Sequence, residues 1–334
     1  MRQLMISLDK KILDPTSAVA RRMVEYGKNS ELYIVIPNAQ KIGLDLSPTV
    51  HVYGSGGNSK VSQFLKTCKT ARRLVPQFKI SSVTTQDPFF TGLLGLRAVH
   101  KFKIPLEVQI HGDFFGSNYY RFKSGPLNHL RWHIGNCVVR HADTIRVVGE
   151  RIQKSLIERL KIDPKKITIR SVPIDYIPLQ ENAVSKSLRA TYPGFKKIFV
   201  FLGRFDKVKN IPWLIDVFSQ VAQNNPEMLL LIVGDGVLRE KINKKIQNIK
   251  LPNKNIRLEP WSVIPLAYYV TSDCILFPSL SEGYGLVPME ANALGKPVIM
   301  NDVGVANYEL KPSDKVTILP INDKEKWIQA ILKV

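Results

Sequence analysis

Residues 274–291 read CILFPSLSEGYGLVPMEA, in which a short apolar run is followed by a segment that contains two glycines and a proline. The first four residues are apolar, which is typical of a buried strand. Gly283 and Gly285 follow in a short loop, and Pro288 is expected to open a helix, because proline at the first helical position gives up no needed hydrogen bond. A strand, a glycine loop and a helix in this order indicate a parallel sheet with helices on its faces.

The same alternation of short apolar runs with helix-length segments extends along the chain. It predicts an α/β fold with two doubly wound Rossmann-like domains, residues 1–172 and 186–334, joined by a linker over residues 173–185 whose prolines interrupt both periodicities. Strands are expected near residues 3–8, 31–36, 49–53, 79–84, 105–111, 143–148 and 166–172, and near residues 198–203, 228–233, 256–260, 274–278, 297–301 and 315–319. Ligands bind outside the carboxyl ends of such strands, so the active site is expected in a cleft across which the domains face each other.

Composition agrees with this organisation. A chain of 334 residues that is 44% hydrophobic can bury two cores. Its three cysteines, Cys68, Cys137 and Cys274, are far apart, which argues against a disulfide framework and shows no metal-site spacing. The amino terminus lacks the apolar core of a signal peptide, and no apolar run approaches the ~18 residues of a membrane-spanning helix. A cytoplasmic location is expected.

Positive charge is concentrated in the first half of the chain. Residues 1–170 carry 28 Lys and Arg against 12 Asp and Glu, whereas residues 171–334 carry 20 against 16. Such a surface suits nucleic acid, anionic lipid or a polyanionic acceptor, and charge alone does not choose among them.

Two carboxylates in the opening stretch suggest sugar chemistry. Glu282, at the carboxyl end of the expected strand, suits hydrogen bonds from sugar hydroxyls, and Glu290, about two turns further on, suits those of a ribose. The glycines and the free amides at the helix start favour an anion such as a diphosphate. Taken alone, such a pair is more often two solvated surface carboxylates.

The string from Phe277 to Ala291 closely resembles the signature of glycosyltransferase family 4, a glutamate separated by any seven residues from a second glutamate. This resemblance implies the GT-B architecture and retaining transfer of a sugar from a nucleotide-diphosphate donor, of UDP or GDP type, with no metal and no further cofactor. In this interpretation Glu282 holds the sugar and Glu290 the ribose. The diphosphate is stabilised by the backbone amides of Gly283, Tyr284, Gly285 and Leu286.

A second segment, IFVFLGRFDKVKN at residues 198–210, places Arg204 just after Gly203 at a strand end and Lys209 just before a helix that Pro212 suits. Two cations there can clamp a diphosphate and stabilise it as it leaves. Solvated surface charges are the alternative interpretation, but the order of residues is similar to the family's phosphate-binding segment. Lys207 is a substitute for Lys209.

Three further positions are supported mainly by the resemblance. Gly234, in a strand-end turn, and Trp261 occupy places where the family borders the donor pocket and holds the base, although a structural turn and simple packing explain them as well. His111 ends an expected strand beside Gly112, where family members commonly have a histidine, and is expected to position the donor sugar. Asp113 is a second polar candidate.

Aromatic and basic side chains interleave at residues 114–123 and 130–133. They suit a membrane headgroup interface, single-stranded nucleic acid or an amphipathic helix packed on its own domain. The expected partners are therefore a nucleotide-sugar donor and a glycan or lipid-linked acceptor. A third expected partner is the anionic inner face of the membrane, to which the protein would bind peripherally. An epimerase or phosphorylase of the same fold is one alternative. A basic nucleic-acid-binding module is another, although no zinc-finger or RRM signature is present.

Overall fold

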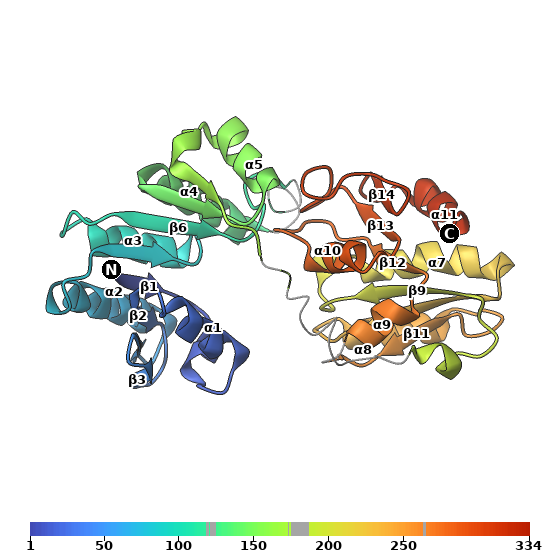
Figure 1. Cartoon of the computed structure of the whole chain (residues 1–334), viewed down its shortest axis with the longest axis horizontal. Coiled ribbons are helices and arrows are strands. Elements are labelled where there is room, and N and C mark those ends of the chain that lie inside the picture. The colour runs from blue at the N-terminus through green and yellow to red at the C-terminus, as the bar shows by residue number, and fades with distance from the viewer. Residues whose placement is uncertain (118–119, 121–124, 173, 175–186, 263–264) are drawn as a thin grey trace. The chain divides into compact units, whose positions relative to one another are not determined.

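The computed structural model describes residues 1–117, 120, 125–172, 174, 187–262 and 265–334 (Figure 1). The described chain divides into two compact units, Met1–Val148 with Ile152–Arg170, and Gly149–Arg151 with Ser171–Val334. Apart from Ile174, the predicted linker lies outside the described residues.

The first unit contains an eight-stranded sheet in the order β3-β4-β2-β1-β5-β6-β7-β8. Seven of these strands were predicted from apolar runs, and all neighbouring pairs are parallel except β3 with β4. The antiparallel edge strand β3 was missed by the sequence analysis. The strands are β1 (Arg2–Ile6), β2 (Glu31–Ile36), β3 (Lys41–Ser47), β4 (Val50–Ser55), β5 (Ser82–Thr85), β6 (Leu106–Ile110), β7 (Thr144–Val147) and β8 (Ile167–Ile169).

Helices of the first unit pack on this sheet. The helices are α1 (Ala18–Tyr26), α2 (Lys60–Gln77), α3 (Phe90–Val99), α4 (Pro126–His141) and α5 (Glu150–Leu160). Helices α2, α3 and α4 lie side by side, and α2 and α3 contact the central strands β1 and β5 or their neighbours. Met23 of α1 and the nearby Ile12 pack with Ile34 and Val50 of the sheet in one apolar cluster. Charged residues are therefore left for the outer surfaces of the helices.

The second unit contains a parallel six-stranded sheet in the order β11-β10-β9-β12-β13-β14, and all six predicted strands are confirmed. The strands are β9 (Lys197–Leu202), β10 (Met228–Val233), β11 (Ile256–Glu259), β12 (Cys274–Phe277), β13 (Val298–Asn301) and β14 (Val316–Leu319). The helices are α7 (Ile211–Asn224), α8 (Arg239–Asn248), α9 (Leu266–Thr271), α10 (Leu286–Ala293) and α11 (Lys324–Leu332).

The core of the second unit is aromatic. Phe199 of β9 packs against Phe218 of α7, and the fully buried Trp327 of α11 packs against Trp213. The Trp327 indole Nε1 donates a hydrogen bond of 3.0 Å to Asn301 Oδ1, which satisfies both buried polar groups.

Chain order in the second sheet reverses between β9 and β12. Strands β10 and β11 follow on one side of β9, whereas β13 and β14 follow on the far side of β12. The loops that leave the carboxyl ends of these two neighbours therefore diverge, and such a reversal is the usual ligand-binding point of a doubly wound sheet.

Candidate active site

Lys209 and Glu282 meet at this reversal point. Lys209 lies in the turn after β9, and Glu282 lies in the loop after β12. Because β9 and β12 are adjacent, the Lys209 Nζ comes within 2.5 Å of the Glu282 Oε1. Each side chain is only 14% exposed, and the ammonium also lies 5.2 Å from the centroid of the Phe277 ring. The structure thus joins two predicted residues that lie 73 positions apart.

The short turn that carries Lys209 is held by one carboxylate. Asp206 Oδ1 accepts hydrogen bonds from the amides of Val208 and Lys209, at 3.1 and 3.3 Å. The carbonyl of Val208 in turn accepts from the amide of Leu280 at 2.8 Å, which ties this turn to the loop after β12. These contacts fix the backbone on both sides of the ion pair.

The glycine loop leads into α10 two residues earlier than expected. The helix begins at Leu286, so the prediction that Pro288 opens it was wrong. Pro288 lies within the first turn, where amides have no intrahelical partner in any case. Gly285 precedes the helix with a φ of 108°, a conformation that favours glycine. The start of α10 consequently presents free amides directly after Glu282.

Glu290 lies in the second turn of α10 and has a partner that the sequence analysis missed. The Tyr269 hydroxyl of α9 donates a 2.5 Å hydrogen bond to Glu290 Oε2. Tyr269 is 2% exposed. Burial, followed by the charge of Glu290 and this hydrogen bond, raises the pKa of Tyr269 well above its ordinary value, so the phenol stays protonated and donating. Tyr269 thereby fixes the orientation of the Glu290 carboxylate.

Arg204 behaves differently from Lys209. Its side chain is 78% exposed and its guanidinium lies 3.7 Å from the Asp206 carboxylate. Lys207, the substitute candidate, is exposed as well. An exposed pair at this distance contributes little to stability, so the Arg204 side chain is free to move toward a ligand.

The predicted glycines after β9 and β10 lie against each other. A Cβ placed on Gly234 would lie 1.9 Å from the carbonyl oxygen of Gly203, so no larger residue fits at Gly234 while the backbone keeps this course. Trp261, beyond β11, is 59% exposed, and the described structure therefore shows no packing role that accounts for most of its surface.

Tyr284 of the glycine loop is buried, and its carbonyl accepts from the Val305 amide at 2.8 Å. Leu286, by contrast, is 39% exposed. The part of the loop around Gly283 and Gly285 is thus anchored on one side and open on the other.

His111 belongs to the first unit and lies directly after β6. Its Nε2 lies 3.2 Å from the Gln109 Oε1, an oxygen that also accepts from the Arg146 guanidinium at 2.5 Å. The residue reaches solvent, yet the protein around it lowers the pKa of its imidazole, mainly by desolvation and secondarily through the charge of Arg146. The ring is therefore neutral near pH 7. Asp113 is buried and caps a local turn through the Gly116 amide at 3.0 Å.

In the part of the chain that the structure describes, no group of three or more His, Cys, Asp or Glu side chains is arranged to hold a metal ion. None of the helices in this part is long and apolar enough to cross a membrane.

Two α/β units with largely parallel sheets, one of them with paired charges and a glycine loop at its switch point, agree with the GT-B class of sugar-transferring enzymes. Family models agree with this class. Residues 190–334 match the model described as glycosyl transferases group 1, and residues 41–176 match the model described as Glycosyltransferase Family 4. The chain belongs to the family 4 glycosyltransferases of GT-B fold, and its class of enzyme is that of a hexosyltransferase.

Characterised relatives are similar at low identity. A UDP-Gal:alpha-D-GlcNAc-diphosphoundecaprenol alpha-1,3-galactosyltransferase of Escherichia coli is 25% identical over 83% of this chain and 72% of its own length. A D-inositol 3-phosphate glycosyltransferase of Corynebacterium efficiens is 26% identical over 73% of this chain and 60% of its own length. The chain therefore spans only part of the length of each of these relatives.

Solved structures show the same fold. Sucrose-phosphate synthase from Thermosynechococcus elongatus superposes with a TM-score of 0.75 at 18% identity and covers 100% of this chain and 89% of that one. HepE from Anabaena, solved in complex with UDP, superposes with a TM-score of 0.74 at 13% identity and the same coverage.

Proposed function

We propose that this protein transfers a hexose from a UDP-sugar to a hydroxyl group of a lipid-linked saccharide, with retention of configuration at the anomeric carbon. The observation that carries this proposal is the Lys209–Glu282 pair at the β9/β12 switch point, directly before the amino terminus of α10. Support for UDP comes from two similar proteins, because HepE was solved with UDP and the E. coli relative is named for UDP-Gal.

The ion pair is suited to an exchange of partners. A nearly buried pair gains little net free energy, because the cost of removing both charges from water roughly offsets their attraction. The diphosphate of an incoming donor offers Lys209 a new anionic partner at modest cost. Glu282 is then released to accept hydrogen bonds from the hydroxyls of the transferred sugar.

Stabilisation of the leaving group follows from the same residues. Negative charge grows on the diphosphate as its bond to the sugar breaks, and Lys209, the α10 amides and the exposed Arg204 together provide cationic and dipolar stabilisation. No metal ion is needed in this scheme. The departing phosphate oxygen takes the proton of the acceptor hydroxyl.

Nucleotide recognition rests on Glu290. Its Oε2 is held by Tyr269, and within the described part of the chain Oε1 has no hydrogen-bond donor. A carboxylate held at one oxygen and open at the other suits two neighbouring ribose hydroxyls. His111 is assigned to donor positioning, because a neutral imidazole suits a hydrogen bond to a sugar better than it suits charge stabilisation.

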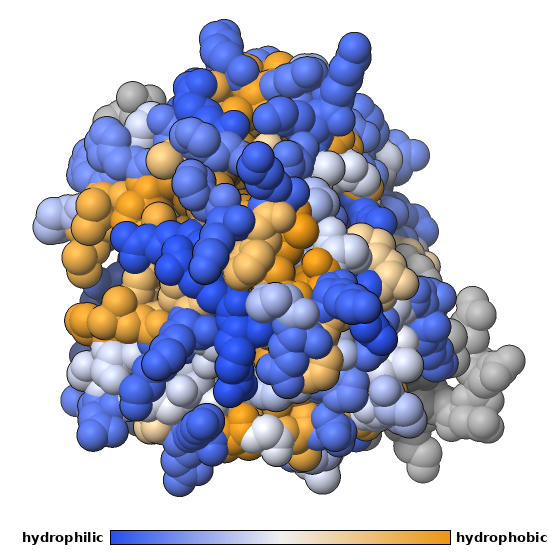
Figure 2. Space-filling view, turned by 90° about the vertical axis from the view of Figure 1, so that its left-hand side faces the viewer, coloured by the Kyte–Doolittle hydropathy of each residue, from blue (hydrophilic) through white to orange (hydrophobic). Residues whose placement is uncertain are grey.

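The acceptor side is assigned to the first unit and to an anionic membrane surface on the cytoplasmic side. Figure 2 looks onto the first unit and shows apolar side chains lying among hydrophilic ones. Phe114 and Phe115, at the start of the interleaved aromatic and basic stretch, are buried, which agrees with the alternative that they pack on their own domain. Leu127 and Leu130 of α4 are instead 72% and 59% exposed, in a unit with a large excess of positive charge.

The test is a reaction with a panel of UDP-, GDP- and ADP-hexoses and lipid-linked saccharide acceptors, followed by proton NMR of the product. We expect one UDP-hexose to react, only when acceptor is present, and to give a product with the anomeric configuration of the donor. Conversion of the donor without an acceptor would indicate an epimerase, and a requirement for phosphate would indicate a phosphorylase. An inverted product would contradict the proposal.

A further inference from the structure

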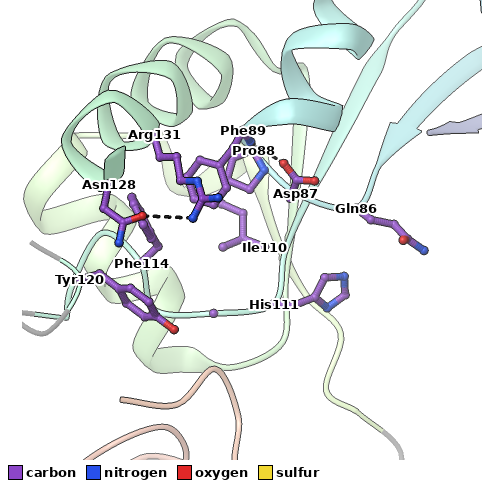
Figure 3. A pocket seen from close by; sticks show the side chains of 11 residues that line it. Gln86, Asp87, Pro88, Phe89, Ile110, His111, Phe114, Tyr120, Asn128 and Arg131 are labelled. Carbon is purple, nitrogen blue, oxygen red and sulfur yellow. Dashed lines mark hydrogen bonds between the residues drawn. The ribbon is translucent and has the colours of Figure 1, made fainter. Parts of the chain in front are cut away.

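A further candidate site lies within the first unit, next to His111, the residue assigned above to positioning of the donor sugar. A cavity of about 250 Å³ opens at the carboxyl ends of β5 and β6, where the loop Gln86–Phe89 and the residues after Ile110 leave the sheet (Figure 3). Tyr120 and two side chains of α4, Asn128 and Arg131, complete its lining. The carboxyl edge of a doubly wound sheet is the edge at which such folds bind ligands.

One wall of the cavity is aromatic. The rings of Phe89 and Phe114 meet edge to face with centroids 4.5 Å apart, and the Tyr120 ring lies 5.3 Å from that of Phe114. Pro88 and Ile110 add further apolar surface. Aromatic faces of this kind provide flat apolar contact, and Tyr120 adds a hydroxyl at its tip, so the wall suits the ring of a sugar.

The lining also carries a cation. Arg131 Nη1 donates a 3.2 Å hydrogen bond to Asn128 Oδ1, and Figure 3 shows both side chains directed toward the space that Tyr120 also faces. Asn128 lies in the first turn of the 16-residue helix α4, whose positive end adds to the charge of Arg131. A guanidinium in this setting suits the paired oxygens of a phosphate or diphosphate.

The acidic group in the lining does not oppose an anion strongly. Asp87 Oδ1 accepts from the amides of Phe89 and Thr91, at 2.7 and 3.3 Å, and Oδ2 accepts from the Thr91 hydroxyl at 2.9 Å. Both oxygens are therefore turned to the start of α3. Its charge is offset by the helix dipole.

Two exposed leucines lie in the first two turns of α4. Leu127 and Leu130, the neighbours of Asn128 and Arg131, are 72% and 59% exposed. An anion that is attached to an alkyl chain would place its charge on Arg131 and its chain along these leucines. A free sugar phosphate would leave them exposed.

We propose that this cavity, called the α4 pocket, binds the acceptor as a glycosyl diphosphate on an alkyl chain, with Arg131 reading the diphosphate and the aromatic wall holding the sugar. This inference rests on the proposed function, because the ligand is an acceptor only if the protein transfers a sugar. The residues it concerns belong to the first unit alone. The proposed acceptor is thus recognised by its charged diphosphate as well as by its sugar.

The test measures binding of matched probes by titration calorimetry. The probes are the hexyl diphosphate derivatives of N-acetylglucosamine, glucose and galactose, and the corresponding hexyl glycosides that lack the diphosphate. For at least one sugar we expect wild-type protein to bind the diphosphate compound about tenfold or more tighter than its glycoside. Arg131→Ala removes this preference and leaves glycoside binding unchanged, and Tyr120→Leu weakens both compounds alike.

Arg140→Ala is the matched control. Arg140 lies on the same helix, is exposed, and donates from Nε to Asn136 Oδ1 at 3.0 Å, yet it does not line the pocket. Its variant keeps the full diphosphate preference. The inference is overturned if no diphosphate compound is preferred, or if Arg131→Ala retains the preference while its thermal unfolding matches that of wild type.

UDP titrated into the same proteins separates the two proposals. Binding of UDP to wild type and to Arg131→Ala, with no preference for a diphosphate probe, would remove the pocket inference and leave the donor proposal intact. A preference for the diphosphate probes without UDP binding would remove the donor proposal and leave the pocket inference intact.

Discussion

The proposed donor residues of the second unit and the proposed α4 pocket of the first unit differ in how their charged side chains are paired. In the second unit the key charges already have partners, Lys209 with Glu282 and Glu290 with Tyr269, and both pairs are largely buried. In the first unit, Arg131 is exposed beside an aromatic wall and has a neutral amide as partner.

This difference indicates a division of labour. Paired charges keep a site ordered, and a ligand acts on them by exchanging partners, so their loss should alter turnover. An open cation beside aromatic rings adds binding strength and selectivity, so its loss should alter affinity for one ligand. Variants of the two regions should therefore have different kinetic signatures.

The largest effect is expected from Glu282→Gln. Loss of the charge leaves Lys209 without its partner and weakens the contact to the transferred sugar, so kcat should fall on the order of 10²-fold or more, as for the loss of one preorganised transition-state contact. Binding of the diphosphate probes to the α4 pocket should be unchanged. Steady-state kinetics with the reactive donor and acceptor measure this effect, and an unchanged kcat would remove the catalytic role of Glu282.

Tyr269→Phe should have an intermediate effect. Without the hydroxyl, Glu290 loses its fixed orientation, and affinity for UDP should fall by about tenfold, within the range for a hydrogen bond to a charged group. Affinity for 2′,3′-dideoxy-UDP, which has no ribose hydroxyls to lose, should stay nearly the same. A purely structural role would weaken both nucleotides equally.

Tyr268→Phe provides the control for that experiment. Tyr268 is the neighbour of Tyr269 on α9 and is buried to a similar degree. The hydrogen bond to the Glu290 carboxylate, however, comes from the Tyr269 hydroxyl. Titration calorimetry should therefore give Tyr268→Phe the UDP affinity of the wild type.

The smallest effect concerns the membrane. We expect vesicles that contain phosphatidylglycerol to bind the protein, and binding to weaken as salt screens the positive charge of the first unit. Leu127→Ser should weaken binding about fivefold, because burial of part of an apolar side chain contributes about 1 kcal/mol. Val237→Ser, which changes an 89% exposed residue of the second unit, should have no effect in the same sedimentation assay. Equal effects of the two variants would argue against membrane binding through the exposed leucines of α4.

Much of the fold was predictable because buried parallel strands appear as uninterrupted apolar runs. The edge strand β3 was missed since its residues, KIGLDLS at 41–47, alternate between exposed and partly buried positions and contain no such run. Its alternation of period two was the available signal.

The candidate donor residues of the second unit could be proposed from the sequence because most of them lie in two short segments, residues 277–291 and 203–209. Their partners were not, because Lys209 meets Glu282 only through the adjacency of β9 and β12, and Tyr269 reaches Glu290 from another helix. The α4 pocket is assembled from four separate segments of the first unit. No local pattern in the sequence marks such a site.

Titration of UDP into wild-type, Glu290→Ala and Arg204→Ala proteins tests the central claim most directly. The account predicts selective binding of UDP over ADP and GDP by the wild type, with affinity reduced by about tenfold or more in Glu290→Ala and also reduced in Arg204→Ala, while thermal unfolding is unchanged. Failure of the folded wild type to bind UDP, or equal affinity in all three proteins, would contradict the assignment of the donor site to the second unit.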